Sequence, residues 1–202
     1  MPDIDELVAQ IRKRYLAIFS EHAKASENSE MLLSDLWLFG LTDRNIALAE
    51  AMPPLIKSEN IHALGPLLRI QLDGFLRLHA FNLVESVDDL VIHVMHGGEV
   101  RDFKDRDGKR LTDRYLVNAL KSDLPWVESV YEKLCGWVHF SDHHIFMAAK
   151  QGGNAGSIEI GIGSYRQKLP PKMILEAVAA FEGIHSVTAD VIQQHFASRR
   201  GM

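Results

Sequence analysis

The chain has 202 residues, of which 47% are hydrophobic, and its formal net charge is −5 at pH 7 with the histidines neutral. A chain of this length usually forms one domain, and this apolar fraction is typical of a protein that buries a core rather than of a disordered chain. The negative charge disfavours a generally basic nucleic-acid coat and a binder of anionic membranes. We therefore expect one domain over residues 1–202.

A single cysteine, Cys135, excludes an intramolecular disulfide within this sequence. It lies in an apolar run beside Trp137, which is typical of a small buried side chain. The N-terminal residues are acidic and lack the basic and apolar pattern of a signal peptide, and no apolar stretch reaches the roughly 20 residues that span a bilayer. These features predict a cytoplasmic protein that has no membrane partner.

Hydrophobic residues recur at helical spacing through the first half of the chain. The pattern predicts helices over residues 3–24, from residue 31 to the pair Pro53-Pro54, over residues 60–84, and from residue 86 to about 96. The stretch 60–84 is apolar almost all round, as expected of the helix at the centre of a bundle.

The second half alternates helices with loops. Residues 97–110 are charged and begin with two glycines, which predicts a solvated loop. Helices are expected over residues 111–121, from 123 to about 139, and over 172–197. Within the excursion 151–168, alternating isoleucines at 158, 160 and 162 indicate a hairpin or an edge strand. The predicted fold class is all-α: an antiparallel helical bundle with a small β-hairpin inserted before the C-terminal helix.

Three charged residues form a stripe along the central helix. Arg69, Asp73 and Arg77 are spaced by four, so they lie on one side of that helix. Charged groups are rarely buried unless they are paired, so one interpretation is an internal salt-bridge network that fixes helix register. The other interpretation is a pocket in which Arg69 and Arg77 bind an anion such as phosphate while Asp73 orients one of them.

A histidine-rich segment follows the helix that is expected to end near residue 139. It contains His139, His143 and His144. His139 ends an apolar helix, so we expect it to face the stripe of Arg69 and Asp73, where an imidazole can act as acid or base near neutral pH. The other two histidines are expected at the surface.

A histidine metal site is an alternative interpretation. His139 and His143 are four residues apart, which suits two ligands on one helical face, and a second pair, three apart, precedes Gly97. The alternative ligand set for a divalent transition metal is His93, His96, His139 and His143. The sequence lacks the His-Glu-x-x-His signature of zinc hydrolases, so neither a metal nor another cofactor is favoured.

The segment Leu67-Leu-Arg69-Ile-Gln-Leu-Asp73, followed by Tyr131-x-x-Leu134-x-x-x-Val138-His139-x-Ser141, resembles a family of helical bacterial domains of unknown function. That family is distantly similar to the HEPN superfamily, whose better-known members are toxin or antiphage ribonucleases. The resemblance covers the region from the central helix to the histidine-rich segment. It implies a metal-independent bundle, often dimeric, that binds or cleaves RNA or binds a nucleotide in a pocket between the two motif helices.

The resemblance also implies roles for residues of this chain. Arg69, Asp73 and His139 would be catalytic, because an imidazole can transfer protons and an arginine can stabilise the charge of a phosphorane. The resemblance places Tyr131 and Ser141 nearby as substrate-binding residues, and the anion-binding interpretation of the stripe adds Arg77 to them.

One departure from the ribonuclease pattern leaves other functions open. Those enzymes carry an arginine, then four to six residues, then a histidine on one helix, whereas Lys133 stands six positions before His139 here. A non-catalytic interaction or scaffold domain is therefore an alternative, and a metal-dependent hydrolase that uses the clustered histidines is a second one. The sequence leaves open whether the chain is an enzyme.

Overall fold

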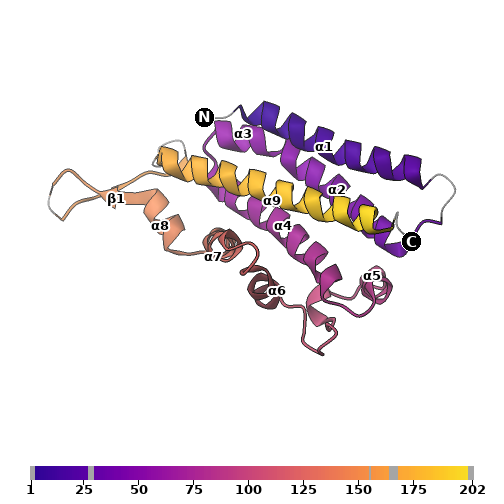
Figure 1. The fold of residues 1–202 in the computed structure, drawn as a ribbon. Helices are drawn as coiled ribbons and strands as arrows, with labels where there is room; N and C mark the ends of the chain where they lie inside the picture. The colour runs from indigo at the N-terminus through magenta and orange to yellow at the C-terminus, as the bar shows by residue number, and fades with distance from the viewer. Residues whose placement is uncertain (1–2, 27–29, 155, 164–167, 200–202) are drawn as a thin grey trace.

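A computed structural model describes residues 3–26, 30–154, 156–163 and 168–199, and Figure 1 shows the fold. Its helices are α1 (Ile4–Ala25), α2 (Leu33–Glu50), α3 (Met52–Lys57), α4 (Ile61–His79), α5 (Val87–Met95), α6 (Asp113–Leu120), α7 (Trp126–Val138), α8 (Asp142–Ala148) and α9 (Pro171–Arg199). Strands β1 (Ala149–Gln151) and β2 (Ile158–Ile160) form an antiparallel hairpin. The predicted fold class, a helical bundle with a hairpin before the last helix, is confirmed.

Helix α4 lies at the centre of the bundle and packs against α2, α3, α6, α7 and α9. In Figure 1, α9 runs alongside α4, while α1 lies on one side of this pair and α6 and α7 lie on the other. Leu64, Leu72 and Leu76 of α4 are fully buried, as the all-round apolar pattern predicted. Although α9 is 29 residues long, no helix in the described part of the chain is long and apolar enough to cross a membrane.

Short polar side chains begin several helices. Asp3 Oδ1 accepts a hydrogen bond from the backbone N–H of Asp5 at 3.0 Å at the start of α1. Ser86 Oγ plays the same role for α5 and Thr112 Oγ1 for α6. Each such cap satisfies a backbone donor that the first turn of a helix leaves unpaired and contributes about 1 kcal/mol to stability.

Two stretches differ from the sequence prediction. Pro53 and Pro54 end α2 as expected, but they also stand in the first turn of α3, where a missing backbone N–H breaks no hydrogen bond of the helix. Helix α8 follows His139 in a stretch where no helix was predicted. Ser141 is the N-cap of α8, and its backbone N–H donates to His144 Nδ1 at 3.2 Å.

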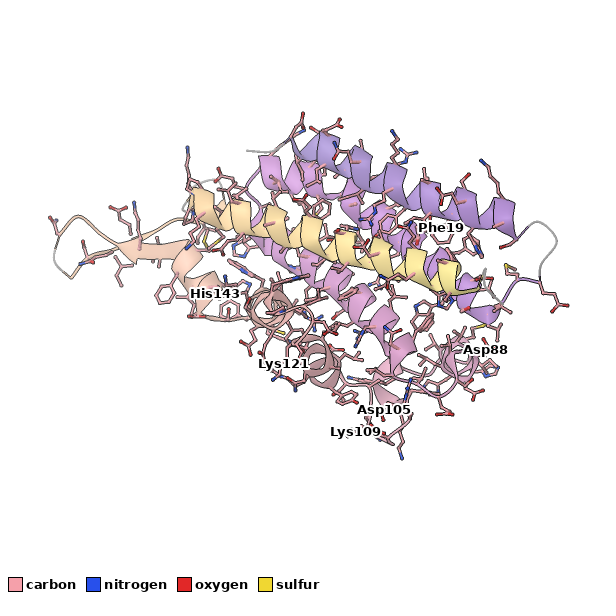
Figure 2. All side chains as sticks on the ribbon, viewed as in Figure 1. Phe19, Asp88, Asp105, Lys109, Lys121 and His143 are labelled. Atoms are coloured by element: carbon pink, nitrogen blue, oxygen red, sulfur yellow. The ribbon has the colours of Figure 1, made fainter. Side chains whose placement is uncertain are left out.

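The charged loop over residues 97–110 is held by its own side chains. Arg106 donates to carbonyl oxygens of the three residues Asn82–Val84, at 2.8 to 3.3 Å. Asp105 is buried, and its Oδ1 accepts a hydrogen bond from the backbone N–H of Lys109 at 2.8 Å. Both residues are labelled in Figure 2. Some charged side chains of this loop therefore form hydrogen bonds within the protein, whereas the sequence suggested a loop that is solvated throughout.

Candidate functional site

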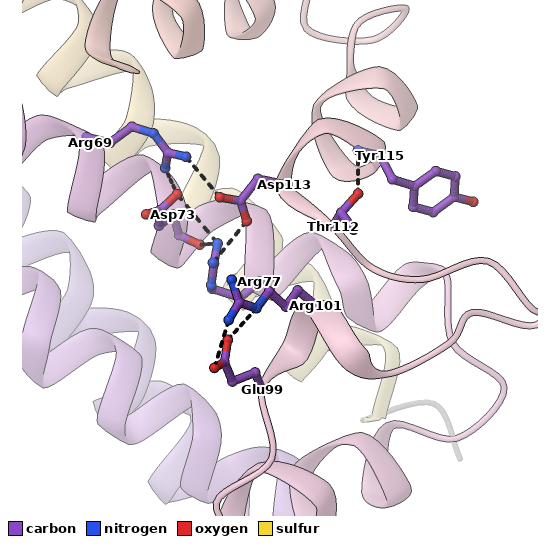
Figure 3. Close-up of polar contacts among 8 residues, drawn as sticks. All are labelled: Arg69, Asp73, Arg77, Glu99, Arg101, Thr112, Asp113 and Tyr115. Atoms are coloured by element: carbon purple, nitrogen blue, oxygen red, sulfur yellow. Dashed lines mark hydrogen bonds and ion pairs between the residues drawn. The ribbon is translucent and has the colours of Figure 1, made fainter. Parts of the chain in front are cut away.

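The charged stripe of α4 is closed by a carboxylate from another helix (Figure 3). Arg69 pairs with Asp73, one turn further along α4, and its Nη2 donates to Asp113 Oδ2 at 2.9 Å. Arg77 Nη2 lies 2.9 Å from Asp113 Oδ1, and Arg77 Nη1 lies 3.5 Å from Asp73 Oδ1. Two guanidinium groups and two carboxylates therefore alternate, so their formal charges cancel. We call these four residues the Arg69 network.

Arg69 is the most buried member of the network, with 9% of its side chain exposed. Its guanidinium carbon lies 4.4 Å from the ring centroid of Tyr131 on α7, within the range of a cation–π contact. Burial by itself lowers the pKa of Arg69, but the hydrogen bond to Cys135 and the ion pair with Asp113 outweigh burial and raise this pKa above its usual value. Arg69 is thus a permanent positive charge that joins α4, α6 and α7.

Of the two interpretations of the stripe, the geometry matches the internal salt-bridge network. An incoming phosphate would have to displace a carboxylate that already neutralises Arg69 or Arg77, and removing a partner from a buried pair is costly. Sequence reasoning missed Asp113, because it lies 44 residues after Arg69 and acts as an ordinary first-turn acid of α6. The position of Asp113 directly after the cap Thr112 indicates the start of a helix. That position gives no indication that Asp113 pairs with Arg69.

His139 lies outside this network. The backbone turns from helical to extended at His139, with φ −97° and ψ 141°, so α7 ends before this residue. The imidazole is exposed, and no described hydrogen bond, ion pair or ring contact joins it to Arg69 or Asp73. Ser141 is engaged elsewhere, since its Oγ donates to the carbonyl oxygen of Gly136 at 2.7 Å.

The four histidines of the alternative metal site are not brought together. His93 lies on α5 with Nε2 3.1 Å from the carbonyl oxygen of Glu99, and His96 follows the end of α5. His143 lies on α8, which Figures 1 and 2 place at the other end of the molecule. Among the described residues, no three His, Cys, Asp or Glu side chains lie close enough to hold a metal ion.

A second feature, which the sequence did not reveal, is a groove of about 620 Å³ between α7 and α9, with α4 beneath it. Gly65 makes this arrangement possible, because a Cβ there would lie 2.5 Å from Cβ of Trp137. The lining side chains are mostly apolar: Ile61, Leu68, Trp126, Val130, Leu134, Trp137, Met173, Ala177, Ala179 and Ala180, together with Gly65 and Gly183.

The polar groups of the groove are few, and they come from its two walls. Lys133 Nζ of α7 lies 3.1 Å from Glu176 Oε2 of α9, and both side chains are exposed. His143 stacks on Trp137 with ring centroids 5.3 Å apart. The groove thus combines an apolar interior with one cation, one carboxylate and one imidazole. Sequence reasoning missed it because its residues come from segments far apart in the chain.

The groove and the Arg69 network adjoin. On α4, Leu68 of the groove precedes Arg69. On α7, Leu134 of the groove precedes Cys135, whose side chain forms a hydrogen bond with Arg69. The network fixes these two helices to each other and so positions two sides of the groove. In comparisons with known proteins, no family model, no curated protein and no solved structure matches this chain.

Proposed function

We propose that this chain is a non-catalytic binding domain whose ligand site is the groove between α7 and α9. The observation that carries this proposal is the preformed groove of about 620 Å³ with its mostly apolar lining. Sites for small molecules and cofactors usually measure about 300 to 1,000 Å³, are lined mainly by apolar and aromatic side chains, and contain a few polar groups that fix orientation. The groove has all three properties.

The lining defines the chemistry of the ligand. Trp126 and Trp137 offer flat aromatic surfaces, and the small residues Ala180 and Gly183 on α9 leave space beside them. Lys133 and Glu176 supply a charge of each sign. We therefore expect a ligand with a flat or chain-like apolar body and one polar or charged end that contacts this pair.

In this proposal the Arg69 network is a structural support. Arg69 joins α4 to Asp113 of α6 and to Tyr131 of α7, and all four charges of the network are compensated. Such a network holds the wall formed by α7 at a fixed distance from α4 without presenting a free cation to a substrate. This role corresponds to the scaffold alternative that the sequence left open.

The test uses the dye 8-anilinonaphthalene-1-sulfonate, which has an apolar ring system and one anionic group. In a Trp37→Phe background, Trp126 and Trp137 are the remaining tryptophans, so energy transfer from tryptophan to the dye comes from the two residues that line the groove. We expect saturable transfer, and we expect Ala180→Phe to weaken the dye at least tenfold by filling the groove. Ala197→Phe places the same side chain at an exposed position of α9 outside the groove and should leave the affinity unchanged. Equal affinities in the two variants would refute the proposal.

RNA or nucleotide binding is the second candidate, and a specific observation favours it. Arg69 of α4 lies over the ring of Tyr131 on α7, so the two helices that carry the motifs are in contact. Aromatic rings also stack beside the groove, where His144 lies 5.3 Å from both His62 and Phe140 between centroids, and bases stack on such rings. In this candidate the domain is a cytoplasmic bacterial protein that acts as a dimer.

This second candidate has its own test. Purified protein is incubated with mixed RNA in EDTA, and its melting temperature is measured with and without nucleotides. Cleavage that is lost in both Arg69→Lys and His139→Ala would support the roles that the resemblance implies. Intact RNA together with an unchanged melting temperature would remove RNA and nucleotides as ligands.

A further inference from the structure

The charges beside the groove are unequal in number. Among the described residues that line the groove, Glu176 is the one carboxylate. Two ammonium groups share it: Lys133 Nζ lies 3.1 Å from Glu176 Oε2, and Nζ of Lys172, just outside the lining, lies 3.8 Å from Glu176 Oε1. All three side chains are between 46% and 86% exposed. These three residues therefore leave an excess of one positive charge, and it is accessible from the solvent.

The groove continues along α9 from these charges to an apolar end. Gly183 is the last residue of α9 that lines it, and a Cβ there would lie 3.7 Å from Cζ2 of Trp126. Gly183 follows Glu176 by seven residues, which corresponds to about 10 Å along a helix. Between them the groove is lined by the small side chains of Ala177, Ala179 and Ala180. This part of the groove is thus an apolar passage with a positive charge at one end and an aromatic ring at the other.

We infer that the occupant of the groove is a straight-chain carboxylate, and this inference rests on the proposed function of the groove. Its carboxylate lies beside Lys133 and Lys172, and its alkyl chain follows α9 to Trp126. A carbon–carbon bond is about 1.5 Å long and advances an extended chain by somewhat less, so roughly eight to ten carbons cover this distance.

The sign of the head group follows from the three charges. A carboxylate adds a partner for the two lysines, whereas an ammonium group would compete with both of them for Glu176. One excess positive charge also matches a single negative charge better than the two of a phosphate. Because Lys133 and Lys172 are exposed, the carboxylate keeps part of its hydration and avoids the cost of burying a charge.

The affinity comes from the alkyl chain. Each methylene group that leaves water for an apolar site strengthens binding by up to about fourfold, so a chain that follows the groove gains affinity with every added carbon. Carbons beyond Gly183 extend past the lining and should add little. The inference therefore predicts both a preferred charge and a preferred length.

The experiment is isothermal titration calorimetry of the full chain with decanoate and with decylammonium, which have equal chain lengths and opposite charges. We expect decanoate to bind at one site, at least tenfold more tightly than decylammonium. In a series of hexanoate, octanoate, decanoate and dodecanoate, the affinity should rise severalfold at each step up to decanoate and change little after it.

Variants place the two ends of the ligand. Lys133→Met should weaken decanoate at least fivefold, whereas Glu176→Gln should strengthen decanoate and weaken decylammonium. Both residues are exposed, so the melting temperatures should stay close to that of the unmodified protein. Lys13→Met removes an exposed lysine of α1 outside the groove and should leave decanoate binding unchanged. Ala180→Phe should weaken decanoate at least tenfold by filling the path of the chain.

Several results would overturn the inference: equal affinities for decanoate and decylammonium, unchanged decanoate binding in Lys133→Met or Ala180→Phe, or no decanoate binding at all. Sedimentation of the protein with phosphatidylglycerol vesicles, without binding of decanoate, would assign the groove to a membrane lipid instead. The dye titration is separate from these measurements. A groove that binds the dye but not decanoate would retain the proposed function and lose this inference, so the two failures are distinguishable.

Discussion

The guanidinium of Arg69 lies over the ring of Tyr131, 4.4 Å from its centroid, and thereby links the central helix α4 to α7 next to the groove. Burial raises the pKa of Tyr131, and the neighbouring Cys135 raises it further, so the phenol stays protonated and neutral at neutral pH. The pair therefore combines a fixed cation with a neutral aromatic surface. This is the arrangement expected of a structural contact whose loss would disturb the groove.

Removal of the Arg69 charge should destabilise the protein strongly. Arg69→Met keeps much of the side-chain length but leaves Asp73 and Asp113 with one cation fewer, and breaking a largely buried pair costs about 3 kcal/mol. Urea denaturation measures this loss as a change in the free energy of unfolding. The control is Arg12→Met, because Arg12 and Glu50 are exposed and such pairs contribute less than about 1 kcal/mol. Equal stability of the two variants would contradict the structural role of the network.

Gly65 should tolerate no side chain. A Cβ at this position would lie 2.5 Å from Cβ of Trp137, so Gly65→Ala forces α7 away from α4 and should cost about 1 to 3 kcal/mol. The emission of Trp137 should change with its environment. Gly40 on α2 is the matched control: nothing lies within 4 Å of a Cβ there, and Gly40→Ala should stabilise the helix by about 0.5 to 1 kcal/mol. A neutral Gly65→Ala would show that the two helices do not need this close approach.

Acidification should destabilise the protein through His185. Its Nδ1 lies 3.1 Å from the hydroxyl oxygen of Tyr15, and burial lowers the pKa of His185 from 6.5 to about 4. The unfolded chain therefore takes up a proton near pH 6.5 whereas the folded protein does not. The resulting stability is fully present above pH 6.5 and is lost as pH falls towards 4, at up to about 1.4 kcal/mol per pH unit. Burial also lowers the pKa of His79, which adds a contribution of the same sign.

The measurement is the free energy of unfolding at pH 7 and pH 5 for the unmodified protein and for His185→Gln. The variant should lose less stability between the two values, whatever its stability at pH 7. If both proteins show the same pH dependence, His185 does not stay neutral in the folded state.

The loop of residues 97–110 should depend on Arg106. This side chain donates to carbonyl oxygens of Asn82–Val84, so Arg106→Ala leaves several acceptors without that donor. We expect cleavage by a protease such as trypsin to accelerate severalfold within the loop, at sites including Lys104 and Lys109. Arg101→Ala is the control, because Arg101 is exposed and contacts Glu99 alone within the loop. Unchanged cleavage in Arg106→Ala would show that the loop does not require this anchor.

The sequence predicted the helices and the central position of α4, because apolar spacing follows directly from burial. It also predicted the pairing of Arg69 with Asp73, because residues four apart are neighbours on a helix. Asp113 and the groove could not be predicted, since both depend on which distant helices pack against α4. The expectation for His139 extended the periodicity of α7 one residue beyond the helix, and the backbone turns at that residue.

The central claim is that the groove between α7 and α9 binds an apolar ligand with one charged end. The direct measurement is fluorine NMR of protein labelled with 5-fluorotryptophan, titrated with 8-anilinonaphthalene-1-sulfonate. Trp126 and Trp137 line the groove, whereas Trp37 packs on Phe81 elsewhere, with ring centroids 5.4 Å apart. We predict saturable shifts of the Trp126 and Trp137 signals with the Trp37 signal unchanged, and loss of these shifts in Ala180→Phe. Signals of Trp126 and Trp137 that do not move, or that move equally in Ala180→Phe, would contradict the claim.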